Sequence, residues 1–330
     1  MTKRPFMKFS HLGILCSGGD SPGMNCALRA VVRTAIFNNI QVTGIKRGYA
    51  GLLRGEFEKM NLSSVGNILQ RGGTILQTSR CPEFHNPAFR KKAVDILKAQ
   101  KIDGLIVIGG DGSFNGALAL WDEHKFPVVG IPGTIDNDIS QTDYTIGFET
   151  AVQTAIEAVD RIRDTAHSHA RTFLVEVMGR NSSAIAIKVG VCTGAENILL
   201  PHEEVDHQQI VDDIQRGILR GKDSSIIIVA EGPTSGRSYK IQKVLKEKYK
   251  LDTHVVILGH IQRGGSPTAN DRFISSEMGS LAVEQFLKNQ FPVVTVLQNG
   301  KVTTTDLKNC VKKSDEHYLE HKNLAKILSI

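Results

Sequence analysis

The chain has 330 residues, 41% of them hydrophobic and 22% charged, and its formal net charge is +6. These proportions are ordinary for a globular protein and exclude an intrinsically disordered chain. No apolar stretch approaches the length of a membrane span, and residues 1–10 lack the apolar core of a signal peptide, so we expect a cytoplasmic protein without a membrane partner. Lysine and arginine are spread along the chain rather than clustered with aromatic residues, which argues against nucleic acid as a partner. Binding of small anionic substrates explains the positive net charge as well.

Apolar strand-like runs alternate with helical patterns along almost the whole chain, which predicts an α/β protein with largely parallel sheets. The expected strands are 12–16, 42–46, 105–108, 128–131, 172–177, 226–230, 255–258 and 293–297. The expected helices include 24–37, 114–125, 148–163 and a final helix within 314–330. Apolar residues recur at three- and four-residue steps in helix 148–163, so it has one apolar face and is suited to carry the chain from a first sheet into a second.

The five cysteines are widely scattered and form no CxxC pair. An odd number at such spacing indicates neither a disulfide framework nor a zinc site, so we expect reduced thiols. They are Cys16, Cys26, Cys81, Cys192 and Cys310.

Two segments rich in glycine and aspartate, 109–113 (GGDGS) and 132–138 (PGTIDND), each follow an expected strand. With helix 114–125 between them they form one βαβ unit, so both lie at the carboxyl edge of one parallel sheet, where open α/β folds bind ligands. Glycines let backbone N–H groups approach phosphate oxygens, and carboxylates hold magnesium or take a proton from a hydroxyl. The pair indicates phosphoryl transfer, although either segment alone is equally typical of an ordinary turn.

A third segment, 17–25 (SGGDSPGMN), follows the first strand and opens helix 24–37, whose N-terminus also favours phosphate. It lacks the GxGxxG pattern, and no acidic residue closes strand 42–46. A dinucleotide-dependent dehydrogenase is therefore disfavoured.

Six segments in fixed order, SGGDSPGMN, QRGGT, IGGDGS, PGTIDND, VEVMGR and GHIQRGGSP, resemble the bacterial type of ATP-dependent 6-phosphofructokinase over about residues 12–272. The resemblance implies an α/β fold of two similar lobes, each a mainly parallel sheet flanked by helices. Residues 1–146 with about 262–312 would form the larger, ATP-binding lobe. Residues 147–261 with about 313–330 would form the smaller lobe, which binds the sugar phosphate.

The same resemblance implies roles on the ATP side, with Mg²⁺ as cofactor and ATP as co-substrate. Asp136 would be the general base for the sugar 1-hydroxyl, with Thr134 beside it, while Arg80 and Arg180 would neutralise the moving phosphoryl group. Asp111 would bind magnesium, supported by Asp138. The implied ATP contacts are Gly19, Arg80, Cys81, Gly110, Asp111, Gly112 and Ser113. For Arg80 and Asp138, a surface ion pair or an Asx turn remains the alternative.

The implied contacts to fructose 6-phosphate come from both lobes: Thr134, Ile135, Asp136, Met178, Gly179, Arg180, Glu231, His260 and Arg263. Taken alone, His260 is equally typical of a structural histidine. In the family two arginines from a neighbouring subunit also bind the 6-phosphate, so the resemblance implies a homotetramer with shared sites. Arg171 matches the first, but His254 stands at the second. Because an imidazole forms no bidentate fork and is mostly neutral above about pH 6.5, we expect weaker, pH-dependent binding of the sugar phosphate.

The family's allosteric effector site is only partly matched. Its retained positions are Arg29, Arg33, Arg163, Glu196, Arg220 and Lys222. Its altered positions are Leu62, Ser63, Asn67, Asp223 and Ser224. Fewer cations predict weaker capture of a diphosphate or phosphoenolpyruvate, and Arg29 with Arg33 is equally typical of a solvated helix face.

Phosphoryl-donor preference follows from two glycines. Diphosphate-using relatives carry Asp where this chain has Gly112 and Lys where it has Gly133, so both positions favour ATP. We therefore expect a glycolytic ATP-dependent 6-phosphofructokinase. The alternatives are the diphosphate-dependent enzyme and a catalytically silent homologue that senses sugar phosphates, against which the three aspartates Asp111, Asp136 and Asp138 speak.

Overall fold

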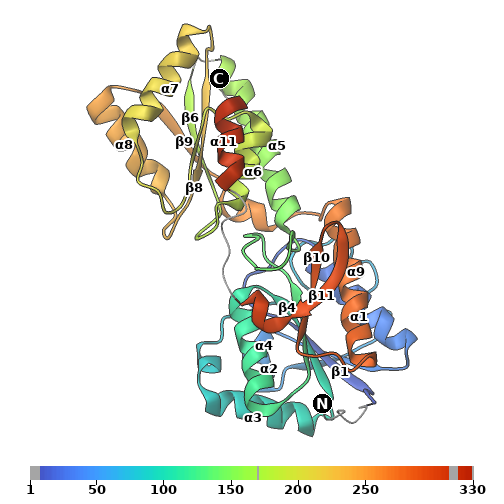
Figure 1. Cartoon of the computed structure of the whole chain (residues 1–330). Coiled ribbons are helices and arrows are strands. Elements are labelled where there is room, and N and C mark those ends of the chain that lie inside the picture. Colours follow the sequence, from blue (N-terminus) through green and yellow to red (C-terminus); the bar gives the residue numbers. More distant parts are fainter. Residues whose placement is uncertain (1–7, 169–170, 312–318, 329–330) are drawn as a thin grey trace. The chain divides into compact units, whose positions relative to one another are not determined.

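A computed structural model describes residues 8–168, 171–311 and 319–328 (Figure 1). The chain divides into two compact units, each with a sheet of its own. Unit 1 comprises Met1–Glu149 and Arg263–Lys313, and unit 2 comprises Thr150–Gln262 and Ser314–Ile330. The assignment of ATP and sugar phosphate to separate lobes remains a prediction.

The sheet of unit 1 has seven strands in the order β11-β10-β5-β4-β1-β2-β3. They are β1 (His11–Cys16), β2 (Gln41–Ile45), β3 (Phe57–Met60), β4 (Gly104–Gly109), β5 (Val128–Pro132), β10 (Val293–Gln298) and β11 (Lys301–Asp306). The five central strands are parallel, and β3 and β11 add to the two edges antiparallel. The carboxyl ends of β1, β4 and β5 are therefore neighbours at one edge of the sheet.

Helices cover the sheet of unit 1 on both faces (Figure 1). They are α1 (Met24–Phe37), α2 (Gly48–Arg54), η1 (Pro82–His85), α3 (Pro87–Ala99), α4 (Asp111–His124), α9 (Ala269–Leu287) and α10 (Leu307–Cys310), and α5 (Phe148–Ser168) begins in this unit. Side-chain caps fix three of their starts, because Asn86 accepts a bond from the Ala88 N–H, Thr268 from the Asp271 N–H and Asp306 from the Lys308 N–H. Helices α1 and α9 lie side by side, and a Cβ at Gly279 would come within 2.5 Å of the Ala27 carbonyl oxygen.

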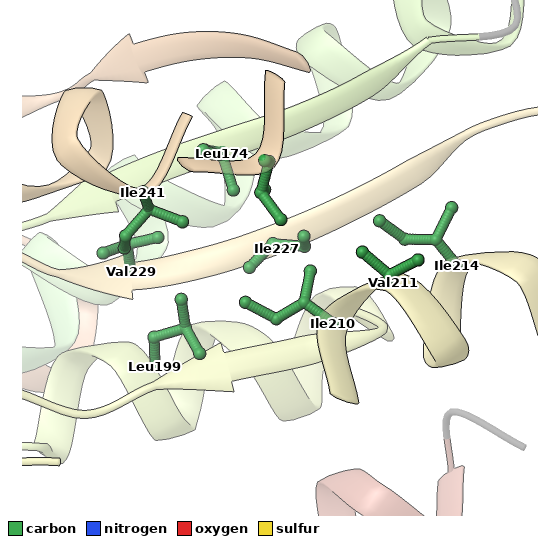
Figure 2. Close-up of a cluster of buried hydrophobic side chains, with 9 residues drawn as sticks. Leu174, Leu199, Ile210, Val211, Ile214, Ile227, Val229 and Ile241 are labelled. Carbon is green, nitrogen blue, oxygen red and sulfur yellow. The ribbon is translucent and has the colours of Figure 1, made fainter. Parts of the chain in front are cut away.

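The sheet of unit 2 has four parallel strands in the order β7-β8-β6-β9. They are β6 (Thr172–Val177), β7 (Asn197–Leu199), β8 (Ser225–Ala230) and β9 (Thr253–Ile257). The remaining helices are α6 (Ala184–Thr193), α7 (His207–Leu219), α8 (Arg237–Tyr249), η2 (Gly259–Arg263) and α11 (Leu319–Leu328). Figure 2 shows the core between the sheet and helices α7 and α8, where Leu174 and Ile227 of the strands meet Ile210, Ile214 and Ile241 of the helices. Since the two central strands, β6 and β8, are buried on both faces, they are almost continuously apolar in sequence.

The α/β prediction and the two mainly parallel sheets are confirmed. All eight expected strands are present within two residues at each end. Strands β3, β7 and β11 were not predicted, because β7 is short and the two edge strands are largely polar. Helix α4 begins at Asp111, so the expected start at Phe114 was wrong, and α5 continues past Arg163 to Ser168. Of the expected final helix, Leu319–Leu328 is helical, and 314–318 and 329–330 lie outside the described residues.

All five cysteines lie in the described ranges and are free thiols. Within those ranges no helix is long and apolar enough to cross a bilayer.

Candidate active site

Three glycine-rich turns of unit 1 meet at the carboxyl ends of β1, β4 and β5. The Ser17 N–H donates to the Ile108 carbonyl oxygen over 2.9 Å, and a Cβ at Gly109 would come within 2.5 Å of the Ser17 carbonyl oxygen. A Cβ at Gly110 would lie 3.5 Å from Cβ of Thr134. Glycine is therefore required at Gly109, whereas the distance at Gly110 is an ordinary van der Waals contact.

The turns surround a cavity of about 760 Å³. Eleven residues with predicted roles line it: Gly19, Arg80, Cys81, Gly110, Asp111, Gly112, Ser113, Thr134, Asp136, Asp138 and Arg263. Ile135 does not line the cavity, and its side chain is fully buried. Most of the residues predicted to act on ATP and on the reacting groups thus share one cavity within unit 1.

Asp136 is a carboxylate of this cavity whose protonation is altered by burial. Desolvation raises the pKa of Asp136, and the positive charge of Arg263 partly opposes that rise. Its backbone N–H donates to Thr134 Oγ1 over 3.2 Å, and the Thr134 carbonyl oxygen accepts from Thr145 Oγ1 over 2.6 Å. Thr134 therefore fixes the turn that presents Asp136. A partly desolvated carboxylate is a stronger base than one in water, which suits it to accept a proton from a hydroxyl.

Asp111 is the first residue of α4, and its carboxylate faces the same cavity as Asp138. Asn115 Nδ2 donates to Asp111 Oδ1 over 2.9 Å and to the Asp111 carbonyl oxygen over 3.0 Å, which fixes the orientation of the carboxylate. The described ranges contain no group of three or more side chains arranged to hold a metal. Because Mg²⁺ is usually held by one or two carboxylates together with substrate phosphates and water, these two aspartates fit a magnesium–nucleotide complex.

Arg263 enters the cavity beside the first turn. Its Nη1 donates to the Asp20 carbonyl oxygen over 3.1 Å, and a Cβ at Gly19 would come within 2.3 Å of that nitrogen. Gly19 thus leaves the space that the guanidinium occupies.

We expect Gly19→Ala to displace Arg263 and to lower kcat/KM by about tenfold. The fold should persist, because the clash is with the flexible end of a side chain. Loss of the nearby positive charge should raise the pKa of Asp136 further, so the acid limb of the pH–rate profile should move to higher pH. A pH–rate profile identical to that of the wild type would show that Arg263 does not act on Asp136.

The sequence did not predict the aromatic wall of the cavity. Tyr49 and Phe84 stack with ring centroids 3.9 Å apart, and both line the cavity together with His85, Arg90 and Asn115. Tyr49 lies far from the other motifs in sequence, and the segment after Arg80 contains no recognisable pattern. Only the position of η1 next to the matched residues Arg80 and Cys81 could have suggested it.

In unit 2, four predicted sugar-phosphate residues follow the carboxyl ends of neighbouring strands. Met178 and Arg180 follow β6, Glu231 follows β8 and His260 follows β9, so they gather at one edge of the sheet. Gly179 between the first two has a φ of 135°, and a Cβ there would come within 2.6 Å of a backbone carbonyl oxygen.

Two residues of the matched motifs are structural. Glu176 is buried and accepts hydrogen bonds from the N–H groups of Gly236 and Ser238, which holds the start of α8. Gln262 is also buried, and its Oε1 accepts from the Met178 N–H over 2.8 Å. These side chains shape the loops that present Met178 and Glu231.

Arg171 and His254 lie at the opposite end of the same sheet. Arg171 precedes β6, and His254 is the second residue of β9 and is paired in register with Phe173. Strands rise about 3.3 Å per residue, so His254, three residues before the end of β9 at Ile257, lies about 10 Å from the carboxyl edge. The imidazole packs against the Phe173 ring, with centroids 5.2 Å apart. Within one chain, Arg171 and His254 therefore do not share a site with His260 and Arg180.

The predicted effector residues fall in both units. Arg29 and Arg33 lie on α1 in unit 1. In unit 2, Arg163, Glu196 and Lys222 line a cavity of about 490 Å³ with His167, Asp164 and Asp223, and Arg220 does not line it. Lys222 Nζ is 3.0 Å from Glu196 Oε1, and Arg163 Nη2 donates to the Thr193 carbonyl oxygen over 2.6 Å. The two basic side chains that line this cavity, Arg163 and Lys222, are outnumbered by the carboxylates of Asp164, Glu196 and Asp223. This arrangement disfavours anion binding.

Comparison with known proteins places the chain in one family. The phosphofructokinase family model matches residues 11–286. The ATP-dependent 6-phosphofructokinases of Bacillus cytotoxicus and Halalkalibacterium halodurans are each 50% identical over 319 residues, which is 97% of this chain and 99% of theirs.

Two solved structures show the same fold. Phosphofructokinase from Saccharomyces cerevisiae is 36% identical with a TM-score of 0.84 over 97% of this chain, which spans 48% of the yeast chain. The pyrophosphate-dependent phosphofructokinase from Marinobacter aquaeolei is 20% identical with a TM-score of 0.82, covering 95% of this chain and 88% of its own. With the motif-bearing turns gathered around one cavity, these likenesses identify the chain as a member of the phosphofructokinase family.

Proposed function

We propose that the chain is an ATP-dependent 6-phosphofructokinase, which transfers the γ-phosphate of ATP to the 1-hydroxyl of fructose 6-phosphate in glycolysis. The products are fructose 1,6-bisphosphate and ADP. The observation that carries the proposal is the single cavity in which three glycine-rich turns meet the carboxylates Asp111, Asp136 and Asp138. The 50% sequence identity to ATP-dependent relatives, over 97% of this chain, supports the same activity.

Asp136 is the general base of the proposed reaction. Its carboxylate accepts the proton of the 1-hydroxyl as the oxygen attacks the γ-phosphorus, and Thr134 fixes the turn that presents it. Because burial raises the pKa of Asp136, the carboxylate binds a proton more readily than an exposed aspartate. The enzyme should lose activity as the pH falls and Asp136 becomes protonated.

The phosphate chain of ATP is proposed to lie along the backbone of Gly19 and the first turn of α4. Gly112 and Ser113 lie in that turn, where the helix dipole favours negative charge. Arg80 and Arg263 line the same cavity and are proposed to neutralise charge on the transferred group and the sugar phosphate.

Asp111 is the proposed magnesium ligand, with Asp138 in support. The ion, when bound with ATP, would shield the phosphate charges and make the γ-phosphorus more electrophilic. The bond from Asn115 keeps Asp111 Oδ1 engaged, which leaves the second carboxylate oxygen for coordination. Removing divalent ions with a chelator should abolish turnover.

The sugar phosphate is proposed to bind Met178, Arg180, Glu231 and His260 at the carboxyl edge of the unit 2 sheet, with Arg180 also acting on the transferred phosphoryl group. Arg171 and His254 lie at the other end of that sheet. We propose that they contact the 6-phosphate bound by a neighbouring copy in a homotetramer. A site shared between subunits would explain why residues predicted to bind one sugar phosphate lie at the two opposite ends of this sheet.

His254→Arg is expected to lower KM for fructose 6-phosphate in this proposal. Arginine presents a charged, bidentate fork to a phosphate, whereas an imidazole offers a single hydrogen bond. A charge-assisted hydrogen bond is typically worth about 1.5 to 3 kcal/mol.

Steady-state kinetics of wild type and His254→Arg check this expectation. Equal KM values for fructose 6-phosphate in the two proteins would remove His254 from the site.

The site disfavours two other functions. A diphosphate-dependent enzyme shares the fold, but Gly112 leaves open space beside the first turn of α4, as a bulky nucleotide requires. A catalytically silent homologue would not need three carboxylates in the cavity. Incubation with ATP, Mg²⁺ and fructose 6-phosphate, followed by ³¹P NMR of the product, tests the proposal. Fructose 1,6-bisphosphate with equimolar ADP is expected, and its absence would contradict the proposal.

A further inference from the structure

An ion pair between a buried arginine and a partly exposed glutamate lies beside the aromatic wall of the cavity in unit 1. Arg90, on α3, is only 8% exposed, and its Nη1 donates to the carbonyl oxygens of Phe84 and His85 over 2.8 and 2.7 Å. Its Nε donates to both carboxylate oxygens of Glu123 on α4, over 3.1 and 2.9 Å, and its Nη2 donates to Glu123 as well. All three guanidinium nitrogens are therefore engaged by protein groups.

The carbonyl groups that Arg90 binds belong to η1, which forms part of the cavity wall. Phe84 in η1 stacks on Tyr49, and the Tyr49 hydroxyl donates to the Ser113 carbonyl oxygen over 2.7 Å. A Cβ at Gly116 would come within 2.9 Å of the Tyr49 ring, so this glycine lets the ring lie against α4. The wall is thus tied to α4 twice, through Tyr49 near its start and through Glu123 near its end.

The two ends of the cavity differ in chemistry. The turns around Gly19 and Gly110 offer backbone N–H groups, whereas Tyr49, Pro82 and Phe84 offer aromatic and apolar surface. A nucleotide whose phosphates lie at the glycine turns would place its nucleoside against the second surface, where stacking and burial favour a flat base. Because its guanidinium is already engaged, Arg90 is not available to neutralise phosphate and can influence binding only through the wall.

We propose that the Arg90–Glu123 ion pair is a positioning element that holds η1 in the shape that accepts the nucleoside end of ATP. The inference rests on the proposed ATP-dependent function. Without the pair, η1 keeps the Tyr49 stack but loses its second tie to α4. The nucleotide must then order the wall as it binds, and this raises KM for ATP without changing the chemical step.

The test uses Glu123→Gln, which keeps the shape of the side chain and removes its charge. The matched control is Glu56→Gln, because Glu56 likewise accepts hydrogen bonds from the Nε and Nη2 of one arginine in the same unit, Arg47, and does not line the cavity. We expect KM for ATP to rise about tenfold in Glu123→Gln, with kcat and KM for fructose 6-phosphate within about twofold of wild type. All three constants should be unchanged in Glu56→Gln.

Hydrogen exchange gives a readout that is independent of turnover. In Glu123→Gln, amides of residues 83–86 should exchange faster than in wild type and Glu56→Gln, and saturating ATP should restore their protection. Unchanged KM for ATP in Glu123→Gln, or a raised KM without faster exchange in 83–86, would overturn the inference while leaving the proposed function intact. A wild-type protein that neither binds nor uses ATP would overturn both.

Discussion

Asp136→Asn is expected to lower kcat by about 10²- to 10⁴-fold while leaving KM for both substrates nearly unchanged. The amide keeps the size of the side chain and its place beside Thr134, but it accepts no proton from the sugar hydroxyl. Because the base acts mainly in the transition state, the loss should appear in kcat rather than in binding. Initial rates at saturating ATP and fructose 6-phosphate measure it.

The stability of this variant provides a control. In the folded state desolvation raises the pKa of Asp136 above its unfolded value, so keeping the carboxylate ionised at pH 7 opposes folding. Removing the ionisable group should therefore leave Tm unchanged or higher. A variant with wild-type kcat would show that Asp136 is not the base, and a lower Tm would show that its charge stabilises the fold instead.

Gly112→Asp is expected to lower kcat/KM for ATP by about 100-fold or more. A Cβ at this position meets no atom within 4 Å, and the backbone is already helical, so the side chain is accommodated without strain. Its carboxylate would enter the cavity beside the proposed triphosphate, where placing like charges together costs several kcal/mol. Steady-state kinetics with ATP measure the loss.

Gly112→Ala separates the effect of charge from that of side-chain volume. We expect its kcat/KM for ATP to fall by no more than about tenfold. Tm should be preserved in both variants, because an acidic residue in the first turn of a helix is favourable. Unimpaired use of ATP by Gly112→Asp would mean that the phosphates lie elsewhere in the cavity.

The central part of the fold was predictable because its strands are apolar on both faces. Strands β3 and β11 escaped prediction since residues such as Glu58 and Lys301 face solvent at the sheet edges, and polar edge strands lack a continuous apolar run. The start of α4 was misplaced because Asp111, Gly112 and Ser113 are typical turn formers, yet they also suit the first turn of a helix.

The part of the candidate site that consists of backbone turns was predictable from the sequence. The part that depends on side-chain packing was not. Segments 109–113 and 132–138 follow adjacent strands, and topology alone brings them together. The wall formed by Tyr49 and Phe84 depends on a tertiary contact between distant segments, which no local pattern encodes. Gln262 and Glu176 lie within matched motifs, but their buried hydrogen bonds are visible only in three dimensions.

The most direct test of the proposed activity is the ratio of kcat/KM for ATP to kcat/KM for diphosphate, measured with saturating fructose 6-phosphate and Mg²⁺ in one coupled assay. The glycine-lined cavity and its three carboxylates predict turnover with ATP and at least about 100-fold less with diphosphate. Equal or better turnover with diphosphate would contradict the account, as would the absence of turnover with either donor.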